Sequence, residues 1–153
     1  MIDLLGTYEC KMDAKGRFMF PAAFKSQLGD TVSNGMVIKR SIFKKCLEIF
    51  PKDNWDHESR KVNKLNMFNR RNAEFVTKYM AGVVPLEFDG IGRLLIPKNL
   101  ISYGEITKQL VLTAGANRIE IWDKAAYDKT VDYDSDDFAN MAQDIMGDLE
   151  NDL

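Results

Sequence analysis

The chain holds a single histidine, two cysteines and no long apolar run, and each shortage excludes a class of protein. One histidine, His57, is too few for most metal centres, and no HExxH, GxSxG or glycine-rich phosphate loop occurs. Two isolated cysteines, Cys10 and Cys46, do not make a disulfide framework, so we expect buried free thiols in a reducing compartment. We therefore predict no enzymatic activity, no metal, no cofactor and no small-molecule substrate.

No apolar stretch approaches the roughly 20 residues that are needed to span a bilayer. Residues 1–10 also lack the basic region and apolar core of a signal peptide. The composition, 45% hydrophobic and 29% charged, is typical of a folded soluble protein. We expect a cytoplasmic protein with no membrane partner.

The net charge of −2 hides a strong asymmetry along the chain. Residues 123–153 contain ten acidic and two basic residues, a sum of −8, which leaves +6 for residues 1–122. Such segregation favours a body that faces nucleic acid and carries an acidic appendage. A tail that is acidic only because it is solvated is an equal alternative.

An internal duplication is the strongest feature of the sequence. Residues 12–21 return as residues 88–97, at an offset of 76, with aspartate, glycine, arginine and proline in place. The match continues to residue 122, and the offset falls to 72 where loops tolerate deletion. The chain divides as follows: a first unit at residues 1–54, a connecting helical segment at 55–80, a second unit at 81–124, and an acidic helical tail at 125–153.

Each unit has the pattern of two strands joined by a tight turn, a short helix and two further strands. In the first unit we expect strands at 6–12, 17–20, 36–39 and 46–50 and a helix at 22–28; in the second, a helix at 98–103 and strands at 110–113 and 118–122. The fold class is thus mainly β with short helices, α+β. One such unit is too small to be stable alone, so two must share a core. We place Trp55, Trp122, Phe24 and Phe50 in that core and not on a surface that stacks on bases.

The two turns carry the candidate functional residues. The carboxylate of Asp13 can accept backbone N–H groups two residues on, and Gly16 can take a positive φ; Asp89 and Gly92 repeat this in the second unit. An arginine follows each turn, at Arg17 and Arg93, where a guanidinium can reach phosphate or a guanine edge. An aspartate–arginine pair that only stabilises the hairpin is the alternative.

Several lysines are further candidates for phosphate contacts: Lys11, Lys15 and Lys25. The basic face of the helical stretch at 55–80 is a second candidate DNA surface, or else the exposed side of a helix that packs on a neighbouring subunit.

The sequence resembles the MraZ family in residues 6–9 (Gly-Thr-Tyr-Glu), in residues 13–17 (Asp-x-Lys-Gly-Arg) with the Phe-Pro that follows, and in residues 117–122 (Asn-Arg-Ile-Glu-Ile-Trp). The resemblance implies tandem AbrB-like swapped-hairpin units that form a small β-barrel and assemble into a homo-oligomeric ring. It implies a transcriptional repressor of the division and cell-wall gene cluster that binds short direct repeats in promoter DNA at the nucleoid.

By position, Asp13 and Arg17 match the first motif of the family, and Asp89 and Arg93 match the second. The second loop departs from the first, because it has Ile91 where the first has Lys15, and we expect it to be less cationic.

Two alternatives stay open: a ring-forming assembly protein that does not read DNA, and an antitoxin-like protein whose acidic tail binds a basic partner. The DNA-binding hypothesis requires both arginines on one face, away from the acidic tail. Whether the hairpins swap within one chain or between chains is open at this point.

Overall fold

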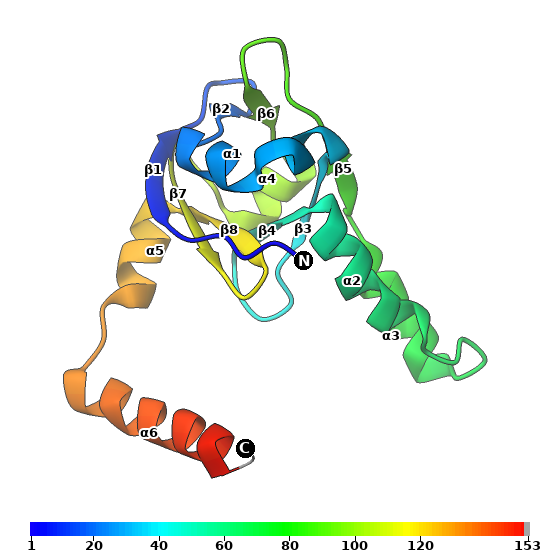
Figure 1. Ribbon diagram of the computed structural model, residues 1–153, viewed down its shortest axis with the longest axis vertical. Coiled ribbons are helices and arrows are strands. Elements are labelled where there is room, and N and C mark those ends of the chain that lie inside the picture. The colour runs from blue at the N-terminus through cyan, green and yellow to red at the C-terminus, as the bar shows by residue number, and fades with distance from the viewer. Residues whose placement is uncertain (152–153) are drawn as a thin grey trace.

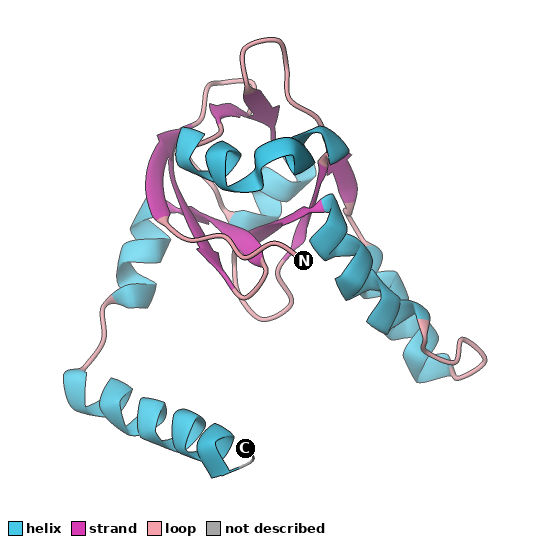
Figure 2. Ribbon diagram, viewed as in Figure 1, coloured by secondary structure: helices cyan, strands magenta, loops and turns pink. Residues whose placement is uncertain are grey.

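The computed structural model describes residues 1–151, which form eight strands and six α-helices (Figures 1 and 2). The strands are β1 (Thr7–Lys11), β2 (Arg17–Met19), β3 (Met36–Arg40), β4 (Leu47–Pro51), β5 (Val84–Leu86), β6 (Arg93–Leu95), β7 (Gln109–Gly115) and β8 (Arg118–Asp123). The helices are α1 (Ala22–Leu28), α2 (Lys52–Asn63), α3 (Arg70–Met80), α4 (Lys98–Gly104), α5 (Lys124–Val131) and α6 (Ser135–Asn151), with a 3-10 turn at Gly29–Asn34. The predicted α+β fold class is confirmed.

Six strands make one antiparallel sheet in the order β1-β7-β8-β4-β3-β5, and β2 pairs with β6 in a separate two-stranded sheet. The predicted hairpins are therefore wrong as strand pairs. The pairing between the two arms of the first hairpin is an isolated bridge from Met12, just after β1, to Phe18 of β2, whereas β1 pairs with β7 and β5 with β3. A lone short hairpin buries little apolar surface. When β2 pairs instead with β6 of the other repeat, Phe18 and Leu94 lie opposite each other in the core.

The repeats are thus interleaved within one chain, and their pairing follows an approximate two-fold axis. Exchanging the repeats turns the β1–β7 pair into the β5–β3 pair, and the β3–β4 pair into the β7–β8 pair. On the axis, equivalent strands pair with each other, so that Phe18 faces Leu94 and Glu48 faces Glu120.

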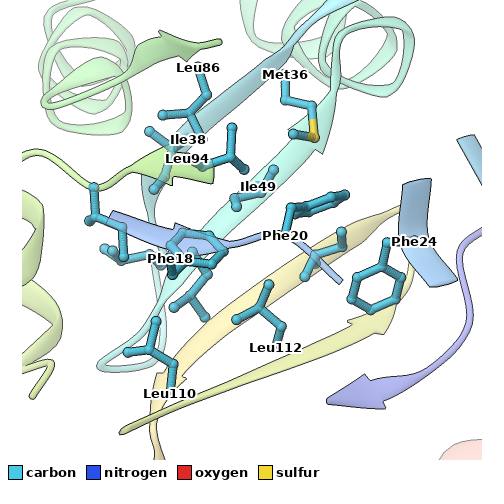
Figure 3. Close-up of a cluster of buried hydrophobic side chains, with 14 of the residues drawn as sticks. Phe18, Phe20, Phe24, Met36, Ile38, Ile49, Leu86, Leu94, Leu110 and Leu112 are labelled. Carbon is cyan, nitrogen blue, oxygen red and sulfur yellow. The ribbon is translucent and has the colours of Figure 1, made fainter. Parts of the chain in front are cut away.

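The main core is built by both repeats together. Figure 3 shows Phe18, Phe20 and Phe24 of the first repeat against side chains of the second, among them Leu94 and Leu112. Because each half contributes large apolar side chains to the same interior, separating the halves would expose both faces.

The aromatic residues predicted to be core are all buried: Phe24, Phe50, Trp55 and Trp122. Of the two free thiols, Cys46 is buried, and burial raises its pKa to about 12, which makes it a poor nucleophile. Cys10 is only half-buried, since it lies on the edge strand β1.

The connecting segment differs from the single helical stretch expected at 55–80. It forms two helices, α2 and α3, which leave the body as a hairpin (Figure 1). Asparagine side chains hold the turn and start the second helix: Asn66 Oδ1 accepts the Phe68 N–H at 3.0 Å within the turn, and Asn69 Oδ1 accepts the Asn72 N–H at 3.1 Å as the N-cap of α3. Phe68 lies fully exposed at the tip.

The predicted C-terminal amphipathic helix is present as α6, and its first turn is capped by Asp134, whose Oδ1 accepts the N–H groups of Asp136 and Asp137. Residues 132–134 separate α6 from α5, which ends at Val131. Figure 1 shows α6 standing apart from the body. The last two residues of the predicted acidic tail, 152–153, lie outside the described residues. None of the helices in residues 1–151 is long and apolar enough to cross a bilayer.

Candidate nucleic-acid interface

The first loop is organised by one carboxylate. Asp13 Oδ1 accepts the backbone N–H groups of Lys15 and Arg17, both at 2.9 Å, and Oδ2 accepts Nε of Arg17 at 2.9 Å. The Asp13 N–H in turn donates to the Arg17 carbonyl at 2.8 Å. Gly16 completes the turn at φ +91°, a conformation that glycine adopts without strain.

The second loop repeats this arrangement atom for atom. Asp89 Oδ1 accepts the N–H groups of Ile91 at 3.1 Å and Arg93 at 2.8 Å, while Oδ2 accepts Nε of Arg93 at 2.7 Å. Gly92 takes φ +88°. Two segments 76 positions apart thus hold their arginines in the same way.

Hydrogen bonds from the backbone N–H of the following arginine are the main cause that lowers the pKa of both aspartates. The arginine side chain adds to the effect, and the pKa of Asp89 falls to about 2. Both carboxylates are therefore ionised throughout the neutral range, and each keeps its guanidinium in place by a charge-assisted bond.

The two loops lie side by side. Arg93 Nη1 is 3.8 Å from Oδ2 of Asp13, so the second arginine reaches the first loop. Each loop is also braced by the other repeat, because the Gly16 carbonyl accepts the Ile96 N–H at 2.9 Å and the Gly92 carbonyl accepts the Phe20 N–H at 3.4 Å. In Figure 1 both loops are at the end of the body opposite α6, as the DNA-binding hypothesis requires.

Lys25 lies against the second loop. A Cβ built on Gly92 would be 2.8 Å from Lys25 Nζ, and the same ammonium sits 4.8 Å from the centre of the Phe88 ring. At the first loop, Ile101 of α4 takes the equivalent place, 3.1 Å from a Cβ on Gly16. The interleaved fold thus sets helix α1 of the first repeat beside the loop of the second.

This placement changes the expected charge of the second loop. The first loop carries Lys15 in its own sequence, where it is exposed, and the second loop receives Lys25 from α1 in place of the lysine that Ile91 replaces. Each loop therefore has one arginine and one lysine beside its aspartate. In the sequence, the offset of 76 pairs Lys25 with Ile101. This pairing indicates the position of Lys25 only when it is known that the repeats interleave, so that α1 lies beside the loop of the second repeat.

The other candidates are spread more widely. Lys11 is exposed at the end of β1 and shares with Lys25 and Met19 a shallow depression of about 620 Å³. The basic face of the connecting segment projects with α2 and α3 from another part of the body, away from the two loops (Figure 1). His57 is exposed on α2.

Comparison with known proteins agrees with the duplicated loops. A model of the family described as "MraZ protein, putative antitoxin-like" matches this chain twice, over residues 4–77 and 80–148, one match for each repeat. The chain belongs to the MraZ family. The MraZ resemblance that the motifs carried is thereby confirmed.

Curated MraZ relatives align with nearly the whole chain. The transcriptional regulator MraZ of Christiangramia forsetii is 48% identical over 147 residues, 96% of this chain and 95% of the relative. That of Flavobacterium psychrophilum is 46% identical over 152 residues, 99% and 97% of the two chains, and that of Cytophaga hutchinsonii is 34% identical over 92% and 93%. All three are named as regulators of transcription and not as enzymes.

Proposed function

We propose that this chain is a sequence-specific, DNA-binding transcriptional regulator that contacts promoter DNA through its two Asp-x-x-x-Arg loops. The observation that carries the proposal is the pair of loops, alike in every hydrogen bond and adjacent at one end of the body. The name shared by its relatives supports the regulatory role. The family resemblance favours a cytoplasmic repressor, located at the nucleoid, that acts on the division and cell-wall gene cluster.

The chemistry of the loop suits DNA. Each aspartate engages Nε of its arginine, which leaves the outer end of the guanidinium to donate to a phosphate or to O6 and N7 of guanine. In Arg93 one of the two outer nitrogens, Nη1, also faces Asp13 at 3.8 Å. Because the side chain is already held, it loses less conformational freedom on binding than a free arginine would. Phosphates repel the aspartates, so these position the arginines and make no direct contact.

One chain offers only two loops, so high affinity requires repetition. We propose that several copies form a ring and present their loops to successive direct repeats in one promoter. Once one copy is bound, its neighbours meet the next repeats at a high effective concentration. Each phosphate that is neutralised releases counterions, which makes binding steeply dependent on salt.

Fluorescence anisotropy on three duplexes of equal length tests the proposal: several short direct repeats, one repeat, and a scrambled sequence. We expect the full repeat array to bind best, and its affinity to fall by about a thousand-fold or more between about 50 and 200 mM salt. Equal binding to the scrambled duplex would overturn sequence-specific recognition. No binding at low salt by a chain that still assembles would favour the assembly protein instead.

Lys25 should contribute as much as Lys15, although only Lys15 belongs to a motif loop. If each neutralises a phosphate, Lys25→Ala and Lys15→Ala should each weaken binding to all sequences alike and lower the salt slope by about 1 per engaged loop. The exposed Lys64, between α2 and α3, provides a matched control as Lys64→Ala. A Lys25→Ala variant with the salt slope of the control would show that Lys25 does not reach DNA.

A further inference from the structure

Helix α6 has an apolar face that nothing in the described chain covers. Phe138, Met141, Ile145 and Leu149 recur at helical spacing, and their exposed fractions are 50%, 57%, 60% and 52%. Four large side chains on one face of a helix in contact with water indicate a surface that becomes buried in an assembly.

All the charged residues of this helix are acidic. Its sequence has five carboxylates and no lysine or arginine: Asp136, Asp137, Asp144, Asp148 and Glu150. Asp137, Asp144 and Asp148 each directly precede an apolar residue of the exposed face, which puts an acidic row beside the apolar one. Within residues 1–151, none of the acids of α6 takes part in an ion pair.

A groove of complementary character lies between β3, α3 and α4. It has a volume of about 460 Å³ and is lined by Lys39, Arg40, Ser41, Ile42, Phe75, Lys78, Tyr79 and Tyr103. None of these residues is acidic and three are aromatic; Arg40 and Lys78 are its accessible cations, since Lys39 is buried beside Glu48. The apolar side chains at its rim are open to solvent, with Ile42 51% and Phe75 43% exposed.

Contacts within the chain hold this groove in shape. Arg40 lies over the ring of Tyr103 at 5.0 Å and donates from Nη2 to the Lys78 carbonyl at 3.2 Å, which joins β3 to α3. Tyr103 donates to the Ser41 carbonyl at 2.8 Å, which joins α4 to the end of β3. The groove is therefore preformed, and an occupant need not order its walls.

We infer that the groove between β3, α3 and α4 of one copy binds helix α6 of a second copy. The inference names the contact within the oligomer proposed above and rests on that part of the proposal. Acidic residues of α6 meet Arg40 and Lys78, and Phe138, Met141 and Ile145 cover the aromatic floor of the groove. A contact between two different surfaces of identical chains passes from copy to copy and generates a closed ring when the rotation closes.

The geometry favours a second copy over the chain's own helix. Helix α5, to which α6 is joined, packs on β7 and β8, whereas the groove is at β3, on the other side of β4 in the sheet. The three residues between α5 and α6 span at most about 11 Å. DNA is the other acidic candidate, but in Figure 1 the loop after β3 is at the end of the body opposite the two arginine loops.

Charge exchange on the full-length chain tests the inference, with particle mass measured by light scattering. Arg40→Glu/Lys78→Glu in the groove and Asp144→Lys/Asp148→Lys on α6 should each reduce the mass several-fold, from ring to single chain. Combining the two sets should restore the ring, because the charges are then exchanged across the contact. Arg70→Glu/Arg71→Glu makes the same charge change on α3 outside the groove and should leave the mass unchanged.

Removing the apolar face alone, as Phe138→Ser/Ile145→Ser, should also dissociate the ring without altering the body. A ring that survives both the groove and the α6 substitutions would overturn the inference. So would a wild-type chain that is a monomer with α6 protected from hydrogen exchange, since α6 would then occupy its own groove. Groove variants that lose DNA binding at unchanged mass would assign the groove to DNA.

These outcomes are separable from those of the proposed function. Wild-type chains that assemble through α6 but bind no repeat DNA would refute the DNA-binding role and leave this contact intact. Chains whose mass is unaffected by every α6 and groove variant, but which still bind repeats through their loops, would refute only the contact.

Discussion

Replacing Arg17 and Arg93 together by alanine should reduce the affinity for repeat DNA on the order of a thousand-fold at fixed salt. Each arginine that contacts a base or phosphate contributes about 1–3 kcal/mol, and one chain would lose both. The loss is larger in a ring, where every subunit is affected. Anisotropy titrations on the repeat duplex measure the affinity, and light scattering must show an unchanged mass.

Arg70→Ala/Arg71→Ala is the matched control, since it removes two exposed arginines from the helical hairpin and leaves the loops intact. Arg17→Lys/Arg93→Lys adds a second comparison, because it keeps the charge but not the planar fork. If guanine edges are read, the lysine variant should bind DNA but lose preference for the repeats. Equal losses in the loop variant and the helical-hairpin control would contradict the assignment of the loops.

Glu48→Gln should lower the free energy of unfolding by about 3–5 kcal/mol, because it leaves a buried ammonium without its counter-charge. Lys39 is 2% exposed, and its Nζ lies 3.6 Å from Oε1 of Glu48. Glu48 sits on the two-fold axis opposite Glu120, a like-charge pairing that is tolerated because Arg118 reaches Glu48 at 3.1 Å and Lys44 reaches Glu120 at 2.6 Å. The midpoint temperature of thermal unfolding should fall by roughly 10 °C.

The loss in the Glu48→Gln variant should depend on pH. Burial lowers the pKa of Lys39 below 10.5, an effect that Glu48 opposes. Between the lowered pKa of the folded chain and 10.5, the unfolded chain therefore holds more protons than the folded one. Stability therefore rises with pH across this window, more steeply in the variant. Glu9→Gln, at an exposed glutamate of β1, is the control and should change little. A Glu48→Gln chain that unfolds at the wild-type temperature would contradict the account.

Local features were predictable from the sequence because local chemistry determines them. The helix expected at residues 22–28 is α1 to the residue, since a proline starts it and a glycine ends it. The aspartate turns were predicted from the reach of a carboxylate and the freedom of glycine. Identical hydrogen bonds in two loops follow from two copies of one short motif.

Pairing between distant segments was not predictable. Alternation in a strand shows which face is buried but not which strand lies beside it, so β1 and β2 were assigned to each other instead of to β7 and β6. The break between α2 and α3 contains no glycine or proline, and its signal was the pair Asn66 and Asn69. The position of Lys25 at the second loop could not be predicted without knowing that the two repeats interleave.

The interleaving of the repeats also has a consequence for synthesis. Thr7 of β1 meets Thr113 of β7 across 106 positions. At a translation rate of roughly 5–20 residues per second, β1 is made about 5–20 s before its partner. For that time the edge of β1 has no native partner strand on the nascent chain, which is the condition under which neighbouring chains aggregate. The yield of folded protein in a cell therefore depends on keeping the first repeat apart from other chains until residue 115 has been made.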